Sequence, residues 1–565
     1  MGGLRNTPTI VSAMIDQFYS WFTYDPSTPL LFTQQYFWVF FALVMGGYSL
    51  LYKKTARRNI FLFAVSLFFY YKTSGFYFII LLFSTLADFS IGWAIYRSKV
   101  KWQRQTLVAL SVVVNLCVLG YFKYAYFVAD FIHDLTGIEL EIINHFALWT
   151  NEAIGTNFIF DRILLPVGIS FFTFQTISYS VDIYRGHIKP VKNILDFGFY
   201  VSFFPQLVAG PIVRASEFIP QLYEPYKLSK ERAGLAVFWI LNGLLKKLVL
   251  ADYLAVQFID RVFDNPQLYS GFETMSALFG YSLQVYADFS GYTDVAIGIA
   301  MLMGFTLPKN FNSPYKATSV ADFWRRWHLS LSTWLRDYLY IPLGGNREGS
   351  IASYTIVFAF FLMIALIVGS PWLSIGLAAV FAQGFVLMRY SRGTERWVNT
   401  NINLMLTMVL GGFWHGSSWN FITWGTLNGV GLVVYKNWKK ISPWADKSKA
   451  YNKAIGLVLT LVFITFTRAW FRSPTWEGAI GILSKIPSDF GWDTVGEVLV
   501  ANWKFYAVLI LGYLIHWIPS VHKEKMRQWV SSASIWSLFL LCVAAIALIY
   551  QILSAEVQPF IYFAF

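Results

Sequence analysis

Long runs of apolar residues recur from one end of this chain to the other, and short polar or basic connectors separate them. A run of about 17 to 25 apolar residues can cross a hydrocarbon core about 30 Å thick as a helix. The longer segments are 31–52, 75–96, 105–121, 163–183, 234–250, 275–303, 353–370, 455–471, 503–518 and 534–553. Shorter segments, typical of re-entrant or strongly tilted helices, are 59–71, 197–213, 373–388, 401–415 and 421–435. The pattern predicts an all-α polytopic membrane protein with roughly 11 to 14 transmembrane or re-entrant helices.

The composition strengthens this prediction, because 56% of the 565 residues are hydrophobic and only 13% are charged. Soluble domains carry about 25% charged residues. Since apolar segments continue throughout, we expect one integral-membrane domain over residues 1–565. The two cysteines form no CxxC motif, and the N-terminus lacks the pattern of a removable signal peptide.

The net charge is +13, and the basic residues gather in the connectors. In a soluble chain this charge would suggest a nucleic-acid partner. Here the positive-inside rule explains it, so no nucleic-acid partner is expected. The acidic connector at 130–141 and the end of the chain are predicted to lie outside. The basic connectors predicted to face the cytoplasm are 53–58, 97–104, 185–192, 309–347, 389–396, 436–453 and 522–527.

His415 lies between two short apolar segments whose outer flanks are both basic. If both flanks are cytoplasmic, the ring is roughly 21 Å along a helix from Asn401, past the middle of the hydrocarbon core. A titratable group at this depth is a candidate functional residue, and imidazole suits proton transfer. The alternative is a histidine satisfied by backbone within a helix bundle. Flanking Gly411, Gly412 and Gly416 predict close helix packing or a broken helix that lines a cavity.

The stretch SVADFWRRWHLSLSTWLRDYLYIPLGGNR predicts an amphipathic helix of about five turns. Ser319 and Asp322 form a capping box at its start, and Pro342 should end it. One face carries Trp324, Trp327, Leu331, Trp334 and Tyr338, and another carries Asp322, Arg325, His328, Ser332 and Arg336. Two interpretations stay open: an interfacial helix anchored by tryptophans, or a helix whose polar face binds a ligand.

Asp288 and Asp294 interrupt the apolar segment 275–303 and must face a partner or a wet cavity. We expect a structural ion pair with an arginine of the amphipathic helix, because their spacing suggests no acid/base dyad. Neither a P-loop, an HExxH motif nor a nucleophile elbow is present. The histidines are scattered, so no metal site is predicted. His516 is expected at the membrane interface, and the remaining histidines in solvated connectors: His133, His145, His187 and His522.

Four motifs together resemble the membrane-bound O-acyltransferase family: DFWRRWHLSLSTWLRDYLYIPLGGNR, LGGFWHGSSWNFITWGTLNG, YADFSGYTDVAIGIAMLMGF and FFPQLVAGPIVR. Within the family they resemble the branch that holds the membrane subunit of bacterial alginate O-acetyltransferase. The resemblance covers roughly residues 28–475. It implies a helical bundle around a central tunnel or funnel, with the family's intramembrane histidine at His415 and its second conserved position at His328.

This chain departs from the family pattern in two places. Two extra apolar segments lie within residues 350–400, where family members run quickly from GGNR to the segment with the intramembrane histidine. Residues 1–27 are also extra, and TIVSAMIDQFYSWF within them predicts an amphipathic helix at the outer face. An even number of inserted spans preserves the side on which the chain re-enters.

The resemblance implies transfer of an acyl group, usually acetyl from acetyl-CoA, towards a hydroxyl of an exported glycan, often through a separate exported acetyltransferase. No bound cofactor is expected, and the location would be the bacterial cytoplasmic (inner) membrane. His415 would act as general base and His328 would support the donor or the proton path. Arg325, Arg326 and Arg336 would meet donor phosphates. Three further residues would have supporting roles: Trp414, Asp288 and Asp322. Of these, Asp322 would pair with Arg326.

Three alternatives stay open at this stage. A cousin branch of the family takes D-alanine from a carrier protein for teichoic acid. A glycan transporter or flippase would use His415 as a proton relay and move its substrate without changing it covalently. A membrane scaffold would only recruit an exported acetyltransferase.

Overall fold

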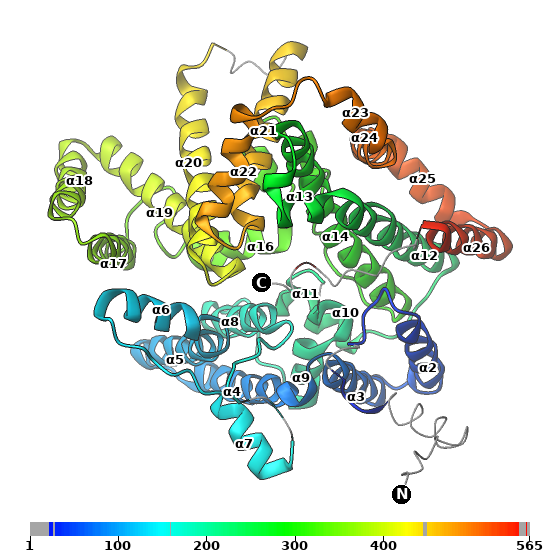
Figure 1. The fold of residues 1–565 in the computed structure, drawn as a ribbon. Helices are drawn as coiled ribbons and strands as arrows, with labels where there is room; N and C mark the ends of the chain where they lie inside the picture. The colour runs from blue at the N-terminus through cyan, green and yellow to red at the C-terminus, as the bar shows by residue number, and fades with distance from the viewer. Residues whose placement is uncertain are drawn as a thin grey trace, which may run out of the picture. The chain divides into compact units, whose positions relative to one another are not determined.

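The structure is a computed structural model that describes residues 22–25, 29–156, 158, 160–208, 210–443, 449–552 and 561. In this part of the chain every regular element is helical (Figure 1), which confirms the predicted all-α class. The amphipathic helix expected within residues 9–22 lies outside the described residues, except for Phe22. The helices divide between two compact units, which are described separately.

The first unit contains the residues up to Leu116, Leu165–Leu228 and Ile299–Thr306. Its apolar segments form helices because a chain in lipid must satisfy its own backbone groups. The segment 197–213, predicted as one short span, is broken instead: α9 ends at Ser202, and a new short helix begins at Phe204 with Pro205 in its first turn. The helices are α2 (Gln35–Leu51), α3 (Thr55–Ser74), α4 (Phe78–Arg97), most of α5 (Lys101–Leu119), α8 (Ile169–Arg185), α9 (Ile194–Ser202), α10 (Phe204–Leu207) and α11 (Ala215–Phe218).

The second unit contains Cys117–Leu164, Ser229–Gly298 and the residues from Leu307 onward. Both apolar segments of the 350–400 region form helices, α17 and α18. The early helices are α6 (Ala125–Thr136), α7 (His145–Ile154), α12 (Lys230–Leu244), α13 (Asp260–Asp264), most of α14 (Gly271–Leu302), α15 (Val320–Trp324) and α16 (Leu329–Leu335). The later helices are α17 (Ile351–Val368), α18 (Pro371–Tyr390), α19 (Arg392–His415), α20 (Trp419–Ile441), α21 (Ala450–Arg472), α22 (Trp476–Ser488), α23 (Val495–Ala501), α24 (Trp503–Trp517), α25 (Ser520–Ser532) and α26 (Ile535–Ile552).

Several helical segments are long and apolar enough to cross a membrane. Five meet this criterion by length and composition: Thr55–Arg97, Lys101–Thr136, Lys230–Asp264, Pro371–Tyr390 and Ala450–Arg472. The number rises to seven if two bent pairs, α23 with α24 and α25 with α26, each count as one span. The range of 11 to 14 included shorter re-entrant helices, which this criterion leaves out, so that number stays a prediction.

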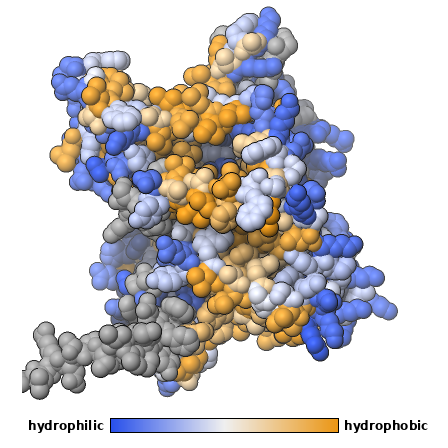
Figure 2. Space-filling view, turned by 90° about the vertical axis from the view of Figure 1, so that its right-hand side faces the viewer, coloured by the Kyte–Doolittle hydropathy of each residue, from blue (hydrophilic) through white to orange (hydrophobic). Residues whose placement is uncertain are grey.

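Apolar side chains cover much of the surface, as a membrane protein requires. Large hydrophobic residues are exposed on α17, α18, α24 and α26, among them Phe358, Trp372, Leu514 and Phe539. Figure 2 shows broad apolar areas on one face of the molecule, with hydrophilic residues gathered beside them. In water such areas would be costly, whereas in a bilayer they face acyl chains.

Candidate functional site

His415 is the last residue of α19, at the break between two helices of a hairpin. Ser391 caps the start of α19 by accepting a hydrogen bond from the amide of Thr394, 3.1 Å away. At Gly416 the backbone is extended, and α20 begins at Trp419. The predicted interruption at the histidine is therefore confirmed.

Glycines in this hairpin allow α19 and α20 to pack closely. A Cβ atom on Gly412 would lie 2.4 Å from the carbonyl oxygen of Phe421, and one on Gly425 would lie 2.4 Å from that of Met408. Both of the alternatives left open for the glycines therefore occur here, since the helix is interrupted and its glycines also permit close packing.

The predicted five-turn amphipathic helix is wrong, because the chain breaks between Arg325 and His328. Its start is correct: the Ser319 hydroxyl accepts from the amide of Asp322, 3.2 Å away. The chain then forms α15, a turn, α16 and a π-helical segment, Arg336–Tyr340. His328 has φ 44°, in the left-handed region that few non-glycine residues adopt.

Asn310 supplies the physical reason for this break. Its carbonyl oxygen accepts from the amide of Leu329 at 2.9 Å, and its side-chain Oδ1 accepts from the amide of Ser330 at 3.1 Å. In a continuous helix these amides would bond to carbonyls four residues earlier. The carbonyl of Arg326 accepts instead from the amide of Asn312, 2.9 Å away. Hydrogen bonds from a distant loop thus replace those of the helix.

The break brings His328 close to His415. The centroids of the two imidazole rings lie 6.5 Å apart, and the Trp414 ring lies 5.0 Å from His415 and 6.3 Å from His328. Both histidines are buried, with 0% and 3% of their surface exposed. Trp424 and Phe471 pack against His415 at 5.1 and 5.6 Å. The two histidine motifs therefore meet in one site.

The two nitrogens of His328 have different surroundings. Its Nδ1 lies 3.2 Å from Oδ1 of Asn310 and 3.4 Å from the amide nitrogen of Leu331. The first contact is a hydrogen bond when Nδ1 carries the proton, and the second when it does not. Its Nε2 has no hydrogen-bond partner among the described residues. Nε2 is therefore the ring nitrogen of His328 that is left for a further hydrogen bond, although His328 itself does not line the cavity described below.

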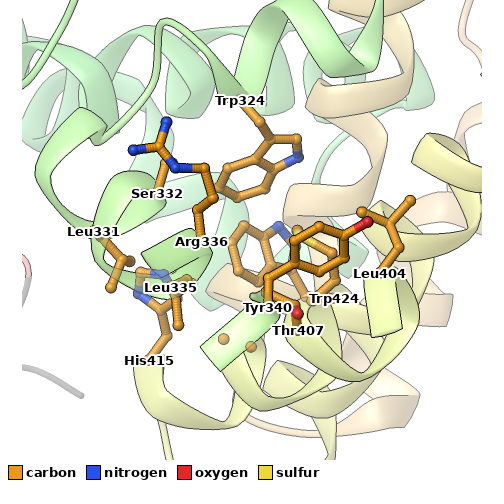
Figure 3. A pocket seen from close by; sticks show the side chains of 13 residues that line it. Trp324, Leu331, Ser332, Leu335, Arg336, Tyr340, Leu404, Thr407, His415 and Trp424 are labelled. Atoms are coloured by element: carbon orange, nitrogen blue, oxygen red, sulfur yellow. The ribbon is translucent and has the colours of Figure 1, made fainter. Parts of the chain in front are cut away.

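A cavity of about 200 Å³ reaches His415 (Figure 3). It is smaller than the roughly 300–1,000 Å³ of sites for drug-sized ligands, and its lining is predominantly apolar. The cavity is lined by Trp324, Leu331, Ser332, Leu335, Arg336, Tyr340, Leu404, Thr407, Met408, Gly411, Gly412, His415 and Trp424.

The three arginines predicted to meet phosphates are placed differently. Arg336 lines the cavity, and a hydrogen bond to Asp337 raises the pKa of its guanidinium, which stays charged. Arg326 pairs with Asp322 at 3.0 Å, as expected from their i, i+4 spacing. Arg325 is exposed and bonds to a backbone carbonyl of its own helix. Only Arg336 therefore contacts the cavity.

Asp288 and Asp294 form structural ion pairs, as predicted, but the predicted arginine partners are wrong. Nζ of Lys247 lies 2.6 Å from Asp288 and 2.6 Å from Asp252. Nζ of Lys246 lies 2.6 Å from Asp294. These lysines lie on a π-helical continuation of α12, Leu245–Asp252. The sequence signal was a pair of lysines inside the apolar segment 234–250.

Close packing of α12 against α14 explains this choice of partner. A Cβ atom on Gly243 would lie 2.4 Å from the carbonyl oxygen of Gly291. Only glycines allow the two backbones to approach so closely, and this brings the neighbouring lysines to the acidic residues of α14. The sequence pattern of neither helix predicts that α12 packs against α14.

His516 corrects another expectation, since it is buried rather than interfacial. Only 3% of its surface is exposed, and its Nε2 accepts from the amide of Tyr315 at 3.1 Å. The four histidines expected in connectors are exposed, but three of them lie on helices instead: His133 on α6, His145 on α7 and His522 on α25, whereas His187 lies in a connector. Among the described residues, no group of three or more His, Cys, Asp or Glu side chains is arranged to hold a metal ion.

The chain is similar in sequence to known membrane-bound acyltransferases. A sequence model described as "MBOAT, membrane-bound O-acyltransferase family" matches residues 97–367. A probable alginate O-acetylase AlgI of Azotobacter vinelandii is 36% identical over 405 residues, which cover 71% of this chain and 67% of the relative. The corresponding protein of Pseudomonas aeruginosa is 35% identical over 492 residues, with 86% and 80% covered. A peptidoglycan O-acetyltransferase of Helicobacter pylori is 29% identical over 563 residues, with 89% and 93% covered.

These similarities extend over most of the chain and agree with its apolar helices and with the sequence resemblance. The protein is a multi-pass membrane enzyme that transfers acyl groups to oxygen, and it belongs to the membrane-bound O-acyltransferase family.

Proposed function

We propose that the protein takes an acetyl group from acetyl-CoA on the cytoplasmic side and passes it across the membrane for O-acetylation of an exported polysaccharide or other cell-surface glycan. A separate exported acetyltransferase would make the final ester, and the location would be the bacterial cytoplasmic (inner) membrane. One observation carries the proposal: His415, with His328 beside it, lies at the wall of a small apolar cavity.

The chemistry needs one base and one leaving group. A neutral His415 accepts the proton of the incoming hydroxyl as its oxygen attacks the thioester carbonyl. The C–S bond then breaks, an ester forms, and the departing thiolate takes the proton from the imidazolium. Nε2 of His328 would form a hydrogen bond either to the acyl donor or to a group that carries the proton to or from His415. The apolar side chains of the lining offer water few hydrogen bonds, which would limit loss of the acetyl group by hydrolysis.

Turnover by the purified protein tests the reaction class. We expect release of CoA from acetyl-CoA when envelope glycan, with its exported partner, is added to the protein in detergent. Movement of glycan across a vesicle membrane without CoA release would instead indicate a flippase. Turnover only with a D-alanyl carrier thioester would indicate the other family branch. Acetylation that persists without any acetyl-CoA use by this protein would indicate a scaffold.

Arg336 offers a test of donor binding. Arg336 lines the cavity, and its guanidinium pairs with Asp337 beside it. Replacing Arg336 by Gln removes this cation, so we expect KM for acetyl-CoA to rise about tenfold, the loss expected for one charge-assisted contact worth about 1.5 kcal/mol. The wild-type KM should also rise with salt. Arg325→Gln is the matched control, because Arg325 is exposed and not part of the lining. Equal KM values in the two variants would contradict the assignment.

A further inference from the structure

Lys123 is a buried lysine that contacts the end of the helix carrying His415. It lies on the π-helical turn Gly120–Tyr124 between α5 and α6, and only 9% of its surface is exposed. Its Nζ lies 2.7 Å from the carbonyl oxygen of Trp414 and 3.0 Å from that of His415. Nothing in the sequence pattern singled it out, because it lies within an aromatic run, GYFKYAYF.

This contact satisfies both partners. A buried ammonium is costly unless it is compensated, and no carboxylate of the described residues forms an ion pair with Lys123. The last carbonyls of an α-helix have no partners within the helix and carry the negative end of its dipole. Lys123 therefore receives two strong acceptors, and α19 receives a cap for its last two residues. The Trp414 ring lies 5.8 Å from Nζ and adds a cation–π contact.

Tyr124 extends the same contact by one residue. Its hydroxyl donates to the carbonyl of Phe413 at 3.0 Å, and its ring stacks on that of Phe413 with centroids 4.3 Å apart. Two consecutive residues of the π-helical turn thus hold three consecutive carbonyls at the end of α19. Beyond His415 the chain turns away at Gly416, so the α-helix itself supplies no later turn that would hold the imidazole.

We infer that Lys123 is a positioning residue for acyl transfer, which fixes the last turn of α19 and thereby directs the His415 ring towards the cavity and His328. This inference rests on the proposed role of His415. Lys123 itself does not contact the cavity, since it is not part of the lining. A displacement of about 1 Å in a catalytic group can cost about 100-fold in rate, so a contact of this kind is worth a measurable factor.

Replacing Lys123 by Met keeps an unbranched side chain that is one atom shorter and removes the hydrogen-bond donors. We expect kcat for acetyl-CoA turnover to fall by about 10- to 100-fold while KM changes little. Lys123→Arg retains charged donors and should recover much of kcat. Lys436→Met is the matched control: Lys436 bonds to Asn401, 3.2 Å away, near the other end of the same helix pair, and its loss should leave kcat unchanged. Equal kcat in the Met and wild-type proteins would overturn the inference.

A second readout does not depend on turnover. Diethyl pyrocarbonate modifies accessible imidazoles, and mass spectrometry reports the rate at His415 separately from other sites. We expect a faster reaction at His415 in Lys123→Met than in the wild type or in Lys436→Met. Unchanged rates would overturn the inference even if acetyl-CoA is not the donor. If Lys123→Met does not accumulate in membranes, Lys123→Gln replaces it in both measurements, because Gln keeps a neutral donor group. We expect Lys123→Gln to show a kcat below that of the wild type and a faster modification of His415. Wild-type values of both quantities in Lys123→Gln would overturn the inference.

His415→Ala in the same series separates this inference from the proposed function. An active His415→Ala protein contradicts the proposed function. An inactive His415→Ala protein together with a fully active Lys123→Met protein contradicts only the positioning role.

Discussion

Replacing His415 by Ala should reduce acyl transfer by at least about 100-fold, because a positioned general base contributes about 10²- to 10⁴-fold. The ring lies at the cavity wall and 6.5 Å from His328, where no other described histidine lines the cavity. The measurement is CoA release by purified protein, together with alkali-labile acetate on the exported glycan of complemented cells. The amount of protein in the membrane should stay normal, since alanine leaves α19 helical.

His516→Ala is the matched control for this variant. Each histidine has 3% of its surface exposed, but His516 accepts from the amide of Tyr315 and does not line the cavity. We expect a loss of thermal stability in His516→Ala with the rate per folded molecule retained. Full acetylation in His415→Ala cells would eliminate the general-base role, and an equal rate loss in both variants would indicate general damage to the fold.

Replacing Lys247 by Met should give the largest loss of stability in the second unit. The lysine lies 2.6 Å from both Asp252 and Asp288, and all three side chains are buried. Without the ammonium, two carboxylates face each other with no cation between them. Removing one partner of a buried ion pair costs about 3–5 kcal/mol. The measurement is the midpoint of thermal unfolding in detergent, with the amount of protein in membranes as a second readout.

A triple variant checks the cause of this loss. Lys247→Met combined with Asp252→Asn and Asp288→Asn removes the unpaired charges as well, so it should recover a large part of the lost stability. A triple variant as unstable as the single one would show that packing of the lysine, rather than its charge, stabilises the unit. A single variant as stable as the wild type would contradict the argument altogether.

Much of the helical framework could be predicted from hydropathy. The segment 275–303 became α14, and 353–370 and 373–388 became α17 and α18, within a few residues at either end. The reason is that lipid offers no hydrogen bonds to the backbone, so an apolar segment of this length must satisfy its own backbone groups and forms a helix. The same argument marked His415, because a titratable ring within such a run is costly without a purpose.

Prediction was weaker where distant residues compete with local hydrogen bonds. The periodicity of apolar residues predicted one helix over 319–342. No residue near Leu329 and Ser330 in the sequence indicates that their amides donate to Asn310 instead of to the preceding turn. The resulting turn gives His328 its position beside His415. Likewise, Lys247 was predicted as part of an ordinary span, and only glycine-mediated packing of α12 on α14 shows its partners.

The amino-acid sequence alone was enough to predict a helical membrane protein of the O-acyltransferase family and to single out two histidines as candidates for the chemistry. These features follow from side-chain hydropathy and from short motifs, which are properties of neighbouring residues. Three contacts, in contrast, needed the packed helices: the ring of His328 lies 6.5 Å from that of His415, Arg336 is the one of the three arginines that lines the cavity, and Lys123 bonds to the end of α19. Those contacts join residues far apart in the chain, so they depend on how helices pack and on which backbone groups each helix end leaves unsatisfied.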